Sequence, residues 1–288
     1  MRLLVFGKTG QVARELADLC KAEGINAEFL GRDAADLANP VQCAARIAGA
    51  EADIVINAAA YTAVDRAEDE PELARTINAE APAAMAAMAH LRAMPFLHIS
   101  TDYVFDGSGS KPWAEDDPTA PQSVYGETKL AGERGVAESA GAHAILRTAW
   151  VFSAHGANFV KTMLRLGAER DALNIVEDQT GGPTPAAAIA AALVTMARAF
   201  HAGGGVSGVF HFAGAPATTW ADFAEAIFAA QPGAPMINRI PTRLFPTPAR
   251  RPANSVLDCR KIADTYGITQ PDWRQGLARV LAQLEAET

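Results

Sequence analysis

The chain has 288 residues, of which 49% are hydrophobic and 20% are charged, and its formal net charge is −8. This length suits one large domain or two smaller ones, and an acidic balance without a long basic run argues against nucleic acid and against an anionic membrane surface as partners. No apolar run approaches the length of a membrane-spanning helix, and the three cysteines, Cys20, Cys43 and Cys259, match no metal-binding spacing, so we expect reduced thiols in a cytoplasmic protein.

A short apolar run followed by a glycine-rich turn opens the chain. Residues 3–6 are predicted to form a strand that ends at Gly7, and a helical pattern follows Gly10. A strand, a tight turn and a helix form the context in which a glycine turn binds the pyrophosphate of a dinucleotide at a helix N-terminus. The third small position of the pattern is Ala13, which still allows close packing. We therefore assign cofactor binding to the turn residues Gly7, Thr9, Gly10, Gln11 and Val12.

A second predicted strand, residues 27–30, ends about twenty residues after the turn. In dinucleotide-binding folds, residues at this point contact the adenosine ribose. Arg32 favours a 2′-phosphate, whereas Asp33 favours a free 2′-hydroxyl. Because Arg32 comes first and can also stack on adenine, we expect NADPH as the cofactor, with NADH accepted. That both residues are ordinary loop charges is the alternative. Asp36 and Leu37 are the next candidate contacts to the cofactor.

The third predicted strand, residues 53–57, is nearly continuous in apolar residues and runs into small ones. Continuous apolar strands that alternate with helices indicate a parallel sheet covered by helices on both faces. Small residues at the strand end would let a cofactor lie against the backbone. This segment adds the cofactor candidates Ala58, Ala59, Ala60, Tyr61 and Thr62.

A fourth predicted strand, residues 96–99, is followed by Thr101, and the next predicted helix begins near Tyr125. Ligands of open α/β sheets bind outside the carboxyl ends of the strands. A hydroxyl at Thr101 would therefore face the same substrate oxygen as the phenol of Tyr125.

Tyr125 and Lys129 are four residues apart, so their side chains share one helical face. An ammonium about 4 Å from the phenol would favour the phenolate by about 4 kcal/mol, which would lower the phenol pKa from about 10 towards neutrality. This spacing arises often by chance, and alone it is more often a surface pair. Together with the glycine turn and Thr101, it predicts Tyr125 as a proton donor.

The remainder of the chain is predicted to form a smaller, loop-rich lobe. We expect an α/β fold with a doubly wound parallel Rossmann sheet over residues 1–150, a candidate return of the chain near 183–213, and a substrate-binding lobe over 151–288. The proline-rich segment 241–252 carries three arginines, of which Arg250 is our candidate for a diphosphate ligand. Solvent exposure without a ligand is the usual role of such arginines.

Seven segments together resemble the extended short-chain dehydrogenase/reductases and, among these, the family of dTDP-4-dehydrorhamnose reductases. They follow the family order and span nearly the whole chain, which makes the set far more specific than any single motif. The segments are residues 7–12, 57–65, 100–105, 124–133, 147–151, 158–164 and 246–252.

The resemblance implies NAD(P)H-dependent reduction of the C4 ketone of dTDP-4-dehydro-L-rhamnose, the last step of dTDP-L-rhamnose synthesis. It implies that Tyr125 protonates the C4 oxygen, that Lys129 binds the nicotinamide ribose and lowers the phenol pKa, and that Thr101 hydrogen-bonds the oxygen. Tyr125 and Lys129 would thus also contact the cofactor. The substrate-binding candidates are Thr101, Asp102, Tyr103, Trp150 and Arg250.

The resemblance also bears on metals and assembly. Some relatives bind magnesium through glutamates at a dimer interface, and Glu15 is present here, but residues 185–192 contain no acid. We therefore expect no metal site. We expect either a monomer or a homodimer that binds a dTDP-sugar as its substrate, and neither nucleic acid nor a membrane as a partner.

Two other functions stay open from the sequence. The first is another nucleotide-sugar epimerase, dehydratase or reductase of the same family, although the dehydratases carry an Asp-Glu pair after the threonine and here Tyr103 follows Asp102. The second is a non-catalytic NADP-binding regulatory subunit, which would not need Thr101, Tyr125 and Lys129 together.

Overall fold

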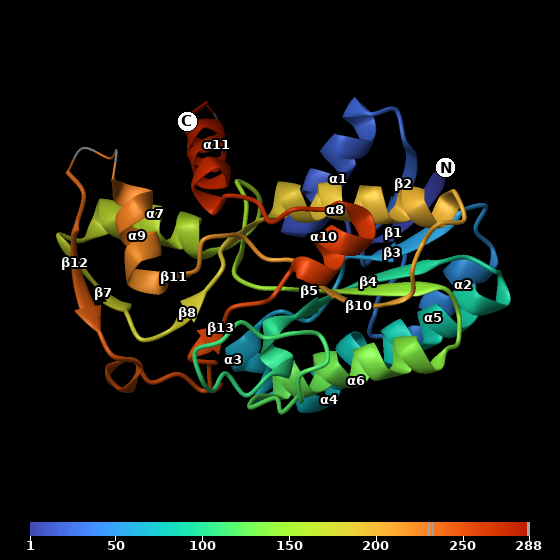
Figure 1. Ribbon diagram of the computed structural model, residues 1–288, viewed down its shortest axis with the longest axis horizontal. Helices are drawn as coiled ribbons and strands as arrows, with labels where there is room; N and C mark the ends of the chain where they lie inside the picture. The colour runs from blue at the N-terminus through green and yellow to red at the C-terminus, as the bar shows by residue number, and fades with distance from the viewer. Residues whose placement is uncertain (230, 232, 287–288) are drawn as a thin grey trace.

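The computed structural model describes residues 1–229, 231 and 233–286. Its centre is a six-stranded sheet in the order β10–β5–β4–β3–β1–β2, in which every neighbouring pair is parallel (Figure 1). The strands are β1 (Arg2–Phe6), β2 (Asn26–Leu30), β3 (Ile54–Asn57), β4 (Phe96–Thr101), β5 (His143–Thr148) and β10 (Gly208–His211). A parallel sheet of this kind must be covered on both faces.

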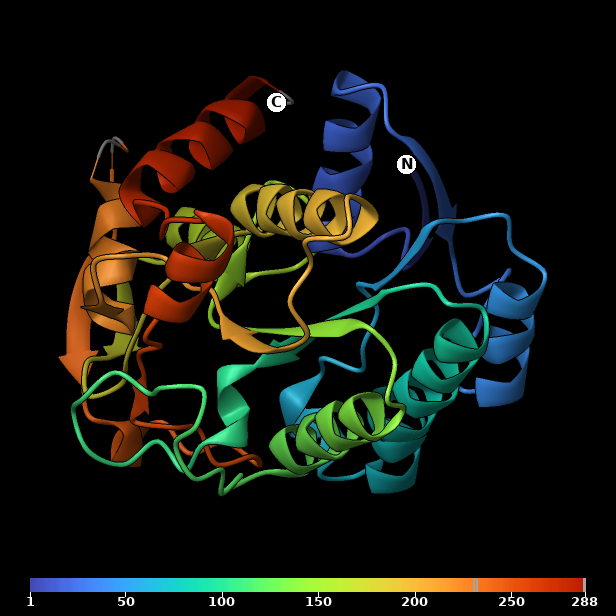
Figure 2. The ribbon, with the colours of Figure 1, turned by 45° about the vertical axis from the view of Figure 1, so that its right-hand side comes forward.

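Helices cover the two faces of the sheet as two separate layers (Figures 1 and 2). Alternate residues of β1 point into the two layers, with Leu3 and Val5 in one apolar core and Leu4 and Phe6 in the other. The first layer contains α1 (Gln11–Ala22), α8 (Ala186–His201) and α10 (Arg260–Tyr266), and the second contains α2 (Pro40–Ala48), α5 (Ala81–Leu91) and α6 (Val124–Glu138). The predicted doubly wound α/β sheet is confirmed.

In the part of the chain that the structure describes, five shorter helical segments lie between the longer elements. They are α3 (Val64–Ala67), α4 (Pro71–Arg75), the π-helical turn η1 (Thr76–Glu80) that leads directly into α5, and the 3₁₀ turns η2 (Asp102–Val104) and η3 (Thr242–Leu244).

A smaller lobe is built around the parallel pair of β7 (Ala172–Val176) and β12 (Met236–Ile240). Its own core includes Phe152, Phe223 and Trp273. The helices α7 (Phe159–Glu169), α9 (Trp220–Phe228) and α11 (Trp273–Ala286) pack there, and the short strands are β6 (Val151–Phe152), β8 (Thr180–Gly181), β9 (Thr184–Pro185), β11 (Thr218–Thr219) and β13 (Asn254–Ser255). Because β10 pairs with β5, the chain crosses between lobe and sheet more than once, and the division at residue 150 stays a prediction.

The order of the strands reverses at β1, whose neighbours β2 and β3 lie on its two sides. In open α/β sheets the ligand crevice lies outside the carboxyl ends of the strands at such a reversal. The segments after β1, β3 and β4 therefore meet at the edge of the sheet where a dinucleotide binds.

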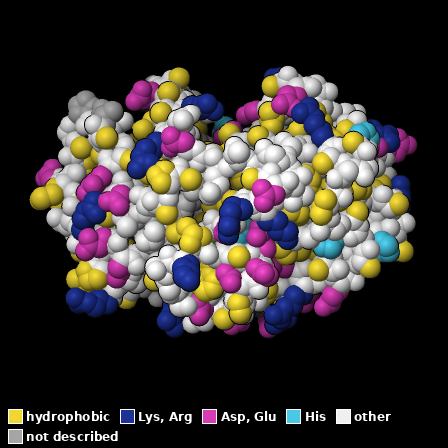
Figure 3. Space-filling view, viewed as in Figure 1, with side chains coloured by type: hydrophobic (Ala, Val, Ile, Leu, Met, Phe, Trp, Pro, Cys, Tyr) yellow, Lys and Arg dark blue, Asp and Glu magenta, His cyan; other side chains and the backbone are white. Residues whose placement is uncertain are grey.

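On the face seen in Figure 3, positive and negative side chains are interspersed rather than gathered into a patch of one sign. Among the described helices, none combines the length and hydrophobicity that a membrane span requires.

Helix α6 approaches the turn after β4 so closely that only glycine fits at position 126. A Cβ there would lie 2.3 Å from the carbonyl oxygen of Tyr103, which is backbone and cannot turn away. In an open helix, Gly→Ala stabilises by about 1 kcal/mol, but overpacking costs about 1–3 kcal/mol. We expect Gly126→Ala to lower the free energy of unfolding by at least about 1 kcal/mol in urea titrations.

Gly49 provides the matched control, since a Cβ there meets only the Ala45 carbonyl at 3.7 Å. Gly49→Ala should leave the free energy of unfolding within about 1 kcal/mol of the parent or raise it slightly. Equal effects of the two substitutions would contradict the close approach of α6.

Candidate active site

The glycine turn between β1 and α1 passes directly against the end of β3. Gly7 has a φ of +117°, and a Cβ there would lie 3.2 Å from the carbonyl group of Ala58. Gly10 is the N-cap of α1, no side chain caps this helix, and its first turn contains no acidic residue. The free backbone N–H groups at the start of α1 are therefore available to an anion.

Lys8, which the sequence analysis did not select, is a second cation near the turn that carries Arg32. Both Lys8 and Arg32 are exposed. The Lys8 side chain extends to within 3.5 Å of the position of a Cβ on Gly31, next to Arg32 in the turn after β2. The lysine was visible inside the glycine turn, but its nearness to residues 31–32 depends on β1 and β2 pairing in the sheet.

The other cofactor candidates lie along the same edge. Leu37 is buried, while Asp36 uses Oδ1 to accept the Ala38 N–H at 3.0 Å. Gln11 on α1 accepts a hydrogen bond from Asn158 Nδ2 at 3.0 Å, which joins the glycine turn to the smaller lobe.

Asn78, which the sequence analysis did not select, fixes the segment after β3. It lies in the π-helical turn η1, and its Oδ1 accepts the Tyr61 N–H at 2.8 Å while its Nδ2 donates to the Tyr61 carbonyl at 3.0 Å. Nδ2 also lies 3.2 Å from Thr128 Oγ1 on α6. Irregular π-turns within helices often occur at functional sites, and this one clamps the cofactor candidates 58–62 to the helix that carries Tyr125.

The structure brings Thr101, Tyr125 and Lys129 together at the carboxyl end of β4. Helix α6 begins next to this point because Ser123 Oγ accepts the Gly126 N–H at 3.2 Å and Glu68 Oε1 accepts the Val124 N–H at 3.0 Å. The Thr101 side chain is close enough to the Tyr125 phenol to affect its pKa.

The expectation that Lys129 lowers the pKa of Tyr125 is wrong for this arrangement. Burial raises the pKa of Tyr125 to about 12, although the neighbouring Thr101 side chain acts in the opposite direction and lowers it. Lys129 is 2% exposed, donates from Nζ to the Ile99 carbonyl at 2.7 Å, and has its own pKa lowered by burial to about 8, which Glu133 opposes. Desolvation is the largest cause of both pKa shifts, and Lys129 is not among the groups that shift the pKa of Tyr125. Tyr125 thus holds its proton at neutral pH, as a proton donor requires.

Asp102 and Tyr103 complete the wall behind Thr101. The Thr101 hydroxyl donates to Asp102 Oδ1 at 3.0 Å and accepts the Tyr103 N–H at 3.2 Å. The Tyr103 ring meets the Tyr125 ring edge-on, with centroids 5.4 Å apart. Burial raises the pKa of Asp102 to about 6, although the nearby Ser255 and Thr101 side chains favour its charged form.

Trp150 links the sheet to the smaller lobe. It has a φ of +49°, and its ring stacks on Trp220 of α9 with centroids 3.5 Å apart and planes 10° apart. Trp220 in turn donates from Nε1 to Gln179 Oε1 at 3.2 Å. Neither Trp220 nor Gln179 was selected from the sequence, since each lies far from Trp150 along the chain.

Arg250 and Arg251, two of the three arginines of the proline-rich segment 241–252, have different contacts. Arg250 is exposed and donates to Gln122 Oε1, just before α6, at 3.1 Å. Arg251 instead forms a bidentate pair with Asp65, at 2.9 and 2.8 Å, and so ties this loop to the main domain. The two contacts bring the 246–252 loop alongside the site.

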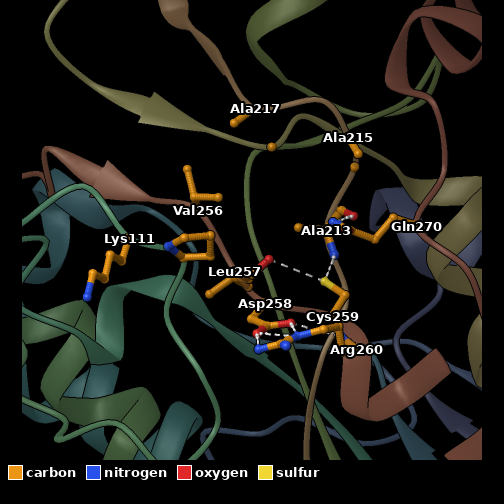
Figure 4. A pocket seen from close by; sticks show the side chains of 13 residues that line it. Lys111, Ala213, Ala215, Ala217, Val256, Leu257, Asp258, Cys259, Arg260 and Gln270 are labelled. Atoms are coloured by element: carbon orange, nitrogen blue, oxygen red, sulfur yellow. Dashed lines mark hydrogen bonds and ion pairs between the residues drawn. The ribbon is translucent and has the colours of Figure 1, made fainter. Parts of the chain in front are cut away.

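A cavity of about 480 Å³ lies elsewhere, beside α10 (Figure 4). It is lined by residues 111–112, 213–215, 217 and 256–260 together with Gly182 and Gln270, and it contains none of the predicted site residues. This cavity is therefore separate from the predicted site at the strand ends.

Within the described residues, no group of three or more His, Cys, Asp or Glu side chains is arranged to hold a metal ion. The Glu15 carboxylate accepts a hydrogen bond from Ser153 Oγ. All three cysteines are buried and free.

Known proteins of similar sequence and structure agree over the full chain. The sequence profile of the RmlD substrate binding domain matches residues 1–286. A dTDP-4-dehydrorhamnose reductase of Burkholderia thailandensis is 46% identical over 99% of this chain and 99% of its own length. The crystal structure of a dTDP-4-dehydrorhamnose reductase from Clostridium acetobutylicum superposes with a TM-score of 0.92 at 35% identity, covering 99% of this chain and 100% of that one.

A second solved structure carries a cofactor. It is a dTDP-4-dehydrorhamnose reductase from Bacillus anthracis in complex with NADP, with a TM-score of 0.91 and 31% identity, covering 98% of this chain and 99% of that one.

A doubly wound sheet with a glycine turn at the strand reversal and a Thr–Tyr–Lys set beside it defines an extended short-chain dehydrogenase/reductase. Within that class, the chain belongs to the RmlD substrate binding domain family. The resemblance inferred from the sequence is confirmed.

Asp102 should make stability depend on pH. Its pKa rises from about 4 in the unfolded chain to about 6 on folding. The raised pKa stabilises the folded state, and this contribution to stability is fully present below about pH 4. It is lost as the pH rises through 6. Asp102→Asn lacks this loss, so its stability relative to the parent should improve by on the order of 2–3 kcal/mol between about pH 4 and pH 7 in urea titrations.

Exposed Asp171 supplies the control. Asp171→Asn should keep a nearly constant difference from the parent over the same range of pH. A constant difference for Asp102→Asn as well would show that this carboxyl is not held in the environment described.

Proposed function

We propose that this chain catalyses the NADPH-dependent reduction of the C4 ketone of dTDP-4-dehydro-L-rhamnose to dTDP-L-rhamnose, the last step of dTDP-rhamnose biosynthesis, with NADH as a weaker cofactor. The observation that carries the proposal is the convergence of Thr101, Tyr125 and Lys129 at the carboxyl end of β4, in a chain whose full-length relatives are dTDP-4-dehydrorhamnose reductases. NADP bound to the Bacillus anthracis relative supports the choice of cofactor.

The residues at the strand ends fit a dinucleotide. The space at Gly10 is open, with no atom within 4 Å of a Cβ placed there, and the N-terminus of α1 is uncapped, so Gly7, Thr9, Gly10, Gln11 and Val12 would hold the pyrophosphate. Residues 58–62 would lie along the cofactor and Arg32, Asp36 and Leu37 around its adenosine. The reduced nicotinamide supplies a hydride to C4 of the sugar.

The chain's own residues handle the proton. Tyr125, which keeps its proton at neutral pH, donates it to the C4 oxygen as negative charge develops there. Thr101 Oγ1 lies next to the phenol and orients the same oxygen. Lys129 binds the ribose hydroxyls of the nicotinamide nucleoside.

Substrate binding falls to residues around this pair. Asp102, Tyr103 and Trp150 border the sugar, and Arg250 is a cation for the diphosphate. Tyr103 stands where sugar dehydratases need a carboxylic acid for the elimination of water, and its ring packs against Tyr125, which favours reduction over dehydration.

The proposal is the same for a monomer and for a homodimer. Three free cysteines fit a reducing compartment, and we place the enzyme in the cytoplasm.

The decisive assay follows NADPH absorbance in the presence of dTDP-4-dehydro-L-rhamnose. The parent protein should oxidise NADPH only when the sugar is present. Tyr125→Phe, which removes the proton donor but keeps the ring, should lose about 10²–10⁴-fold in kcat. Its dissociation constant for NADPH should stay within about threefold of the parent, since only one hydroxyl is removed.

Oxidation without sugar, or none with verified sugar, would contradict the proposed reaction. Near-normal turnover by Tyr125→Phe would contradict only the assignment of the proton donor.

Lys8 and Arg32 should set the preference for NADPH. Two cations at the adenosine end would favour a 2′-phosphate, so Lys8→Met with Arg32→Ser should raise KM for NADPH by about tenfold or more while KM for NADH changes little. Steady-state kinetics with both cofactors provide the measurement. Lys21→Met, at the far end of α1, is the matched control, and a parallel rise in both KM values would refute the assignment.

A further inference from the structure

The loop of residues 153–158, which leads into α7 of the smaller lobe, is bound to the first turns of α1. It contacts Gln11 and Glu15, which are four positions apart and therefore share one face of that helix. Asn158 Nδ2 donates to Gln11 Oε1 at 3.0 Å, and the Ser153 hydroxyl donates to the Glu15 carboxylate. The start of α1 is thus held from the smaller lobe by two side-chain hydrogen bonds.

The neighbours of Asn158 fix the direction in which its amide points. Its Oδ1 accepts the Lys161 N–H at 3.2 Å, as the N-cap of α7. Its Nδ2 lies 2.7 Å from the Ser153 carbonyl oxygen and 3.3 Å from that of His155. A backbone N–H only donates and a carbonyl oxygen only accepts, so both ends of the amide are identified. The group that faces Gln11 is therefore the NH₂ group of Asn158.

The direction of the Gln11 amide follows from that of Asn158. An NH₂ group only donates, so the Gln11 atom that meets it at 3.0 Å is the oxygen. The NH₂ group of Gln11 is left at the other end of the amide, and no group among the described residues binds it. The stem of Gln11 is also confined, because a Cβ on Gly156 would lie 3.2 Å from its Cγ.

The position of Gln11 in α1 places this NH₂ group where an anion would bind. Gln11 is the first residue of the helix, directly after the N-cap Gly10. Side chains of a helix tilt towards its N-terminus, and the first backbone N–H groups there have no partner within the helix. The side-chain NH₂ group therefore adds a donor to an end of α1 that already presents donors.

We infer that Asn158 is a positioning residue for the cofactor, because it holds the Gln11 amide with its NH₂ group, rather than its oxygen, available to the pyrophosphate. The inference deepens the proposed function and rests on it, since the pyrophosphate site at the glycine turn belongs to that proposal. A glutamine amide that turned freely would present its oxygen part of the time, and this oxygen would repel the phosphate oxygens. Hydrogen bonds to a charged acceptor are about twice as strong as those between neutral groups, so the orientation affects affinity.

The structural role of Asn158 can be separated from this positioning role, because the two use different atoms. Oδ1 caps α7, whereas Nδ2 holds Gln11. Asn158→Ser keeps a side-chain oxygen that caps a helix well and removes the NH₂ group. Gln11→Met removes the whole amide and keeps the length of the side chain.

The test is a double-mutant cycle on the dissociation constants of NADPH and NADH, measured by fluorescence titration of the full-length protein without sugar. Asn158→Ser should raise both constants by the same factor, about threefold to tenfold, since both cofactors carry the pyrophosphate. In the Gln11→Met background, Asn158→Ser should cause no further rise beyond about twofold, because the group through which Asn158 acts is gone.

Asn174→Ser is the matched control. Asn174 also lies in the smaller lobe, where its side chain accepts a hydrogen bond from Asn238 on the exposed β12–β7 pair, and both constants should stay at the parent value. Unchanged constants in Asn158→Ser would overturn the inference. An equal rise in the presence and absence of the Gln11 amide would also overturn it, since Asn158 would then act through the loop alone.

A second measurement needs no variant of Asn158, and it decides if Asn158→Ser does not fold. In the ¹⁵N spectrum of the labelled parent protein, the side-chain NH₂ signal of Gln11 is the one that Gln11→Met lacks. This signal should shift when NADPH is added and shift similarly with NADH. A signal that both cofactors leave in place would contradict an NH₂ group that faces the pyrophosphate.

Neither measurement depends on turnover. A protein that shows the expected cycle but does not oxidise NADPH in the presence of the sugar would lose the proposed reaction and keep the role of Asn158. Normal turnover together with cofactor constants that ignore Asn158→Ser would do the reverse.

Discussion

The close packing of α6 on the carboxyl end of β4 is the constraint on which the site depends. Gly126 admits the Tyr103 carbonyl, Thr128 meets Asn78, and Lys129 binds the Ile99 carbonyl, so the first two turns of the helix are fixed at several levels. One turn later, Glu133 forms a buried ion pair with Arg147 of β5. Breaking such a pair typically costs about 3–5 kcal/mol, because one buried charge is left uncompensated. The helix therefore cannot slide without losing several buried polar contacts at once.

Because this packing holds ionisable side chains away from water, it shifts their pKa values. Removing Tyr125, Lys129 and Asp102 from water disfavours their charged forms, and the pKa shifts of all three follow from burial first. The i,i+4 rule gives the separation of a phenol and an ammonium but carries no information on desolvation. A site that keeps Tyr125 protonated and lowers the pKa of Lys129 to about 8 is suited to delivering a proton at neutral pH.

The fold and the core of the site were predictable because they rest on local patterns. Alternating apolar strands and helices predict the covered parallel sheet, and the strand–glycine–helix context predicts the turn at Gly7. Lys8, Asn78 and Trp220 were not assigned their roles, because each acts through a residue distant in sequence that only strand pairing or helix packing brings near. The direction in which the pKa of Tyr125 shifts was predicted wrongly for the same reason, since burial is a property of the whole fold.

The smaller lobe is not an independent unit attached to a finished cofactor domain. Trp150, in a left-handed backbone conformation at the end of β5, is stacked on Trp220 from α9, and Asn158 of the lobe binds Gln11 of the glycine turn. Arg251 joins the proline-rich loop to Asp65 near α3. Residues that would hold the sugar and residues that would hold the dinucleotide thus share hydrogen bonds and ring contacts. A change in the lobe is expected to reach the cofactor side through these contacts, so we expect specificity for the sugar and affinity for the cofactor to be coupled.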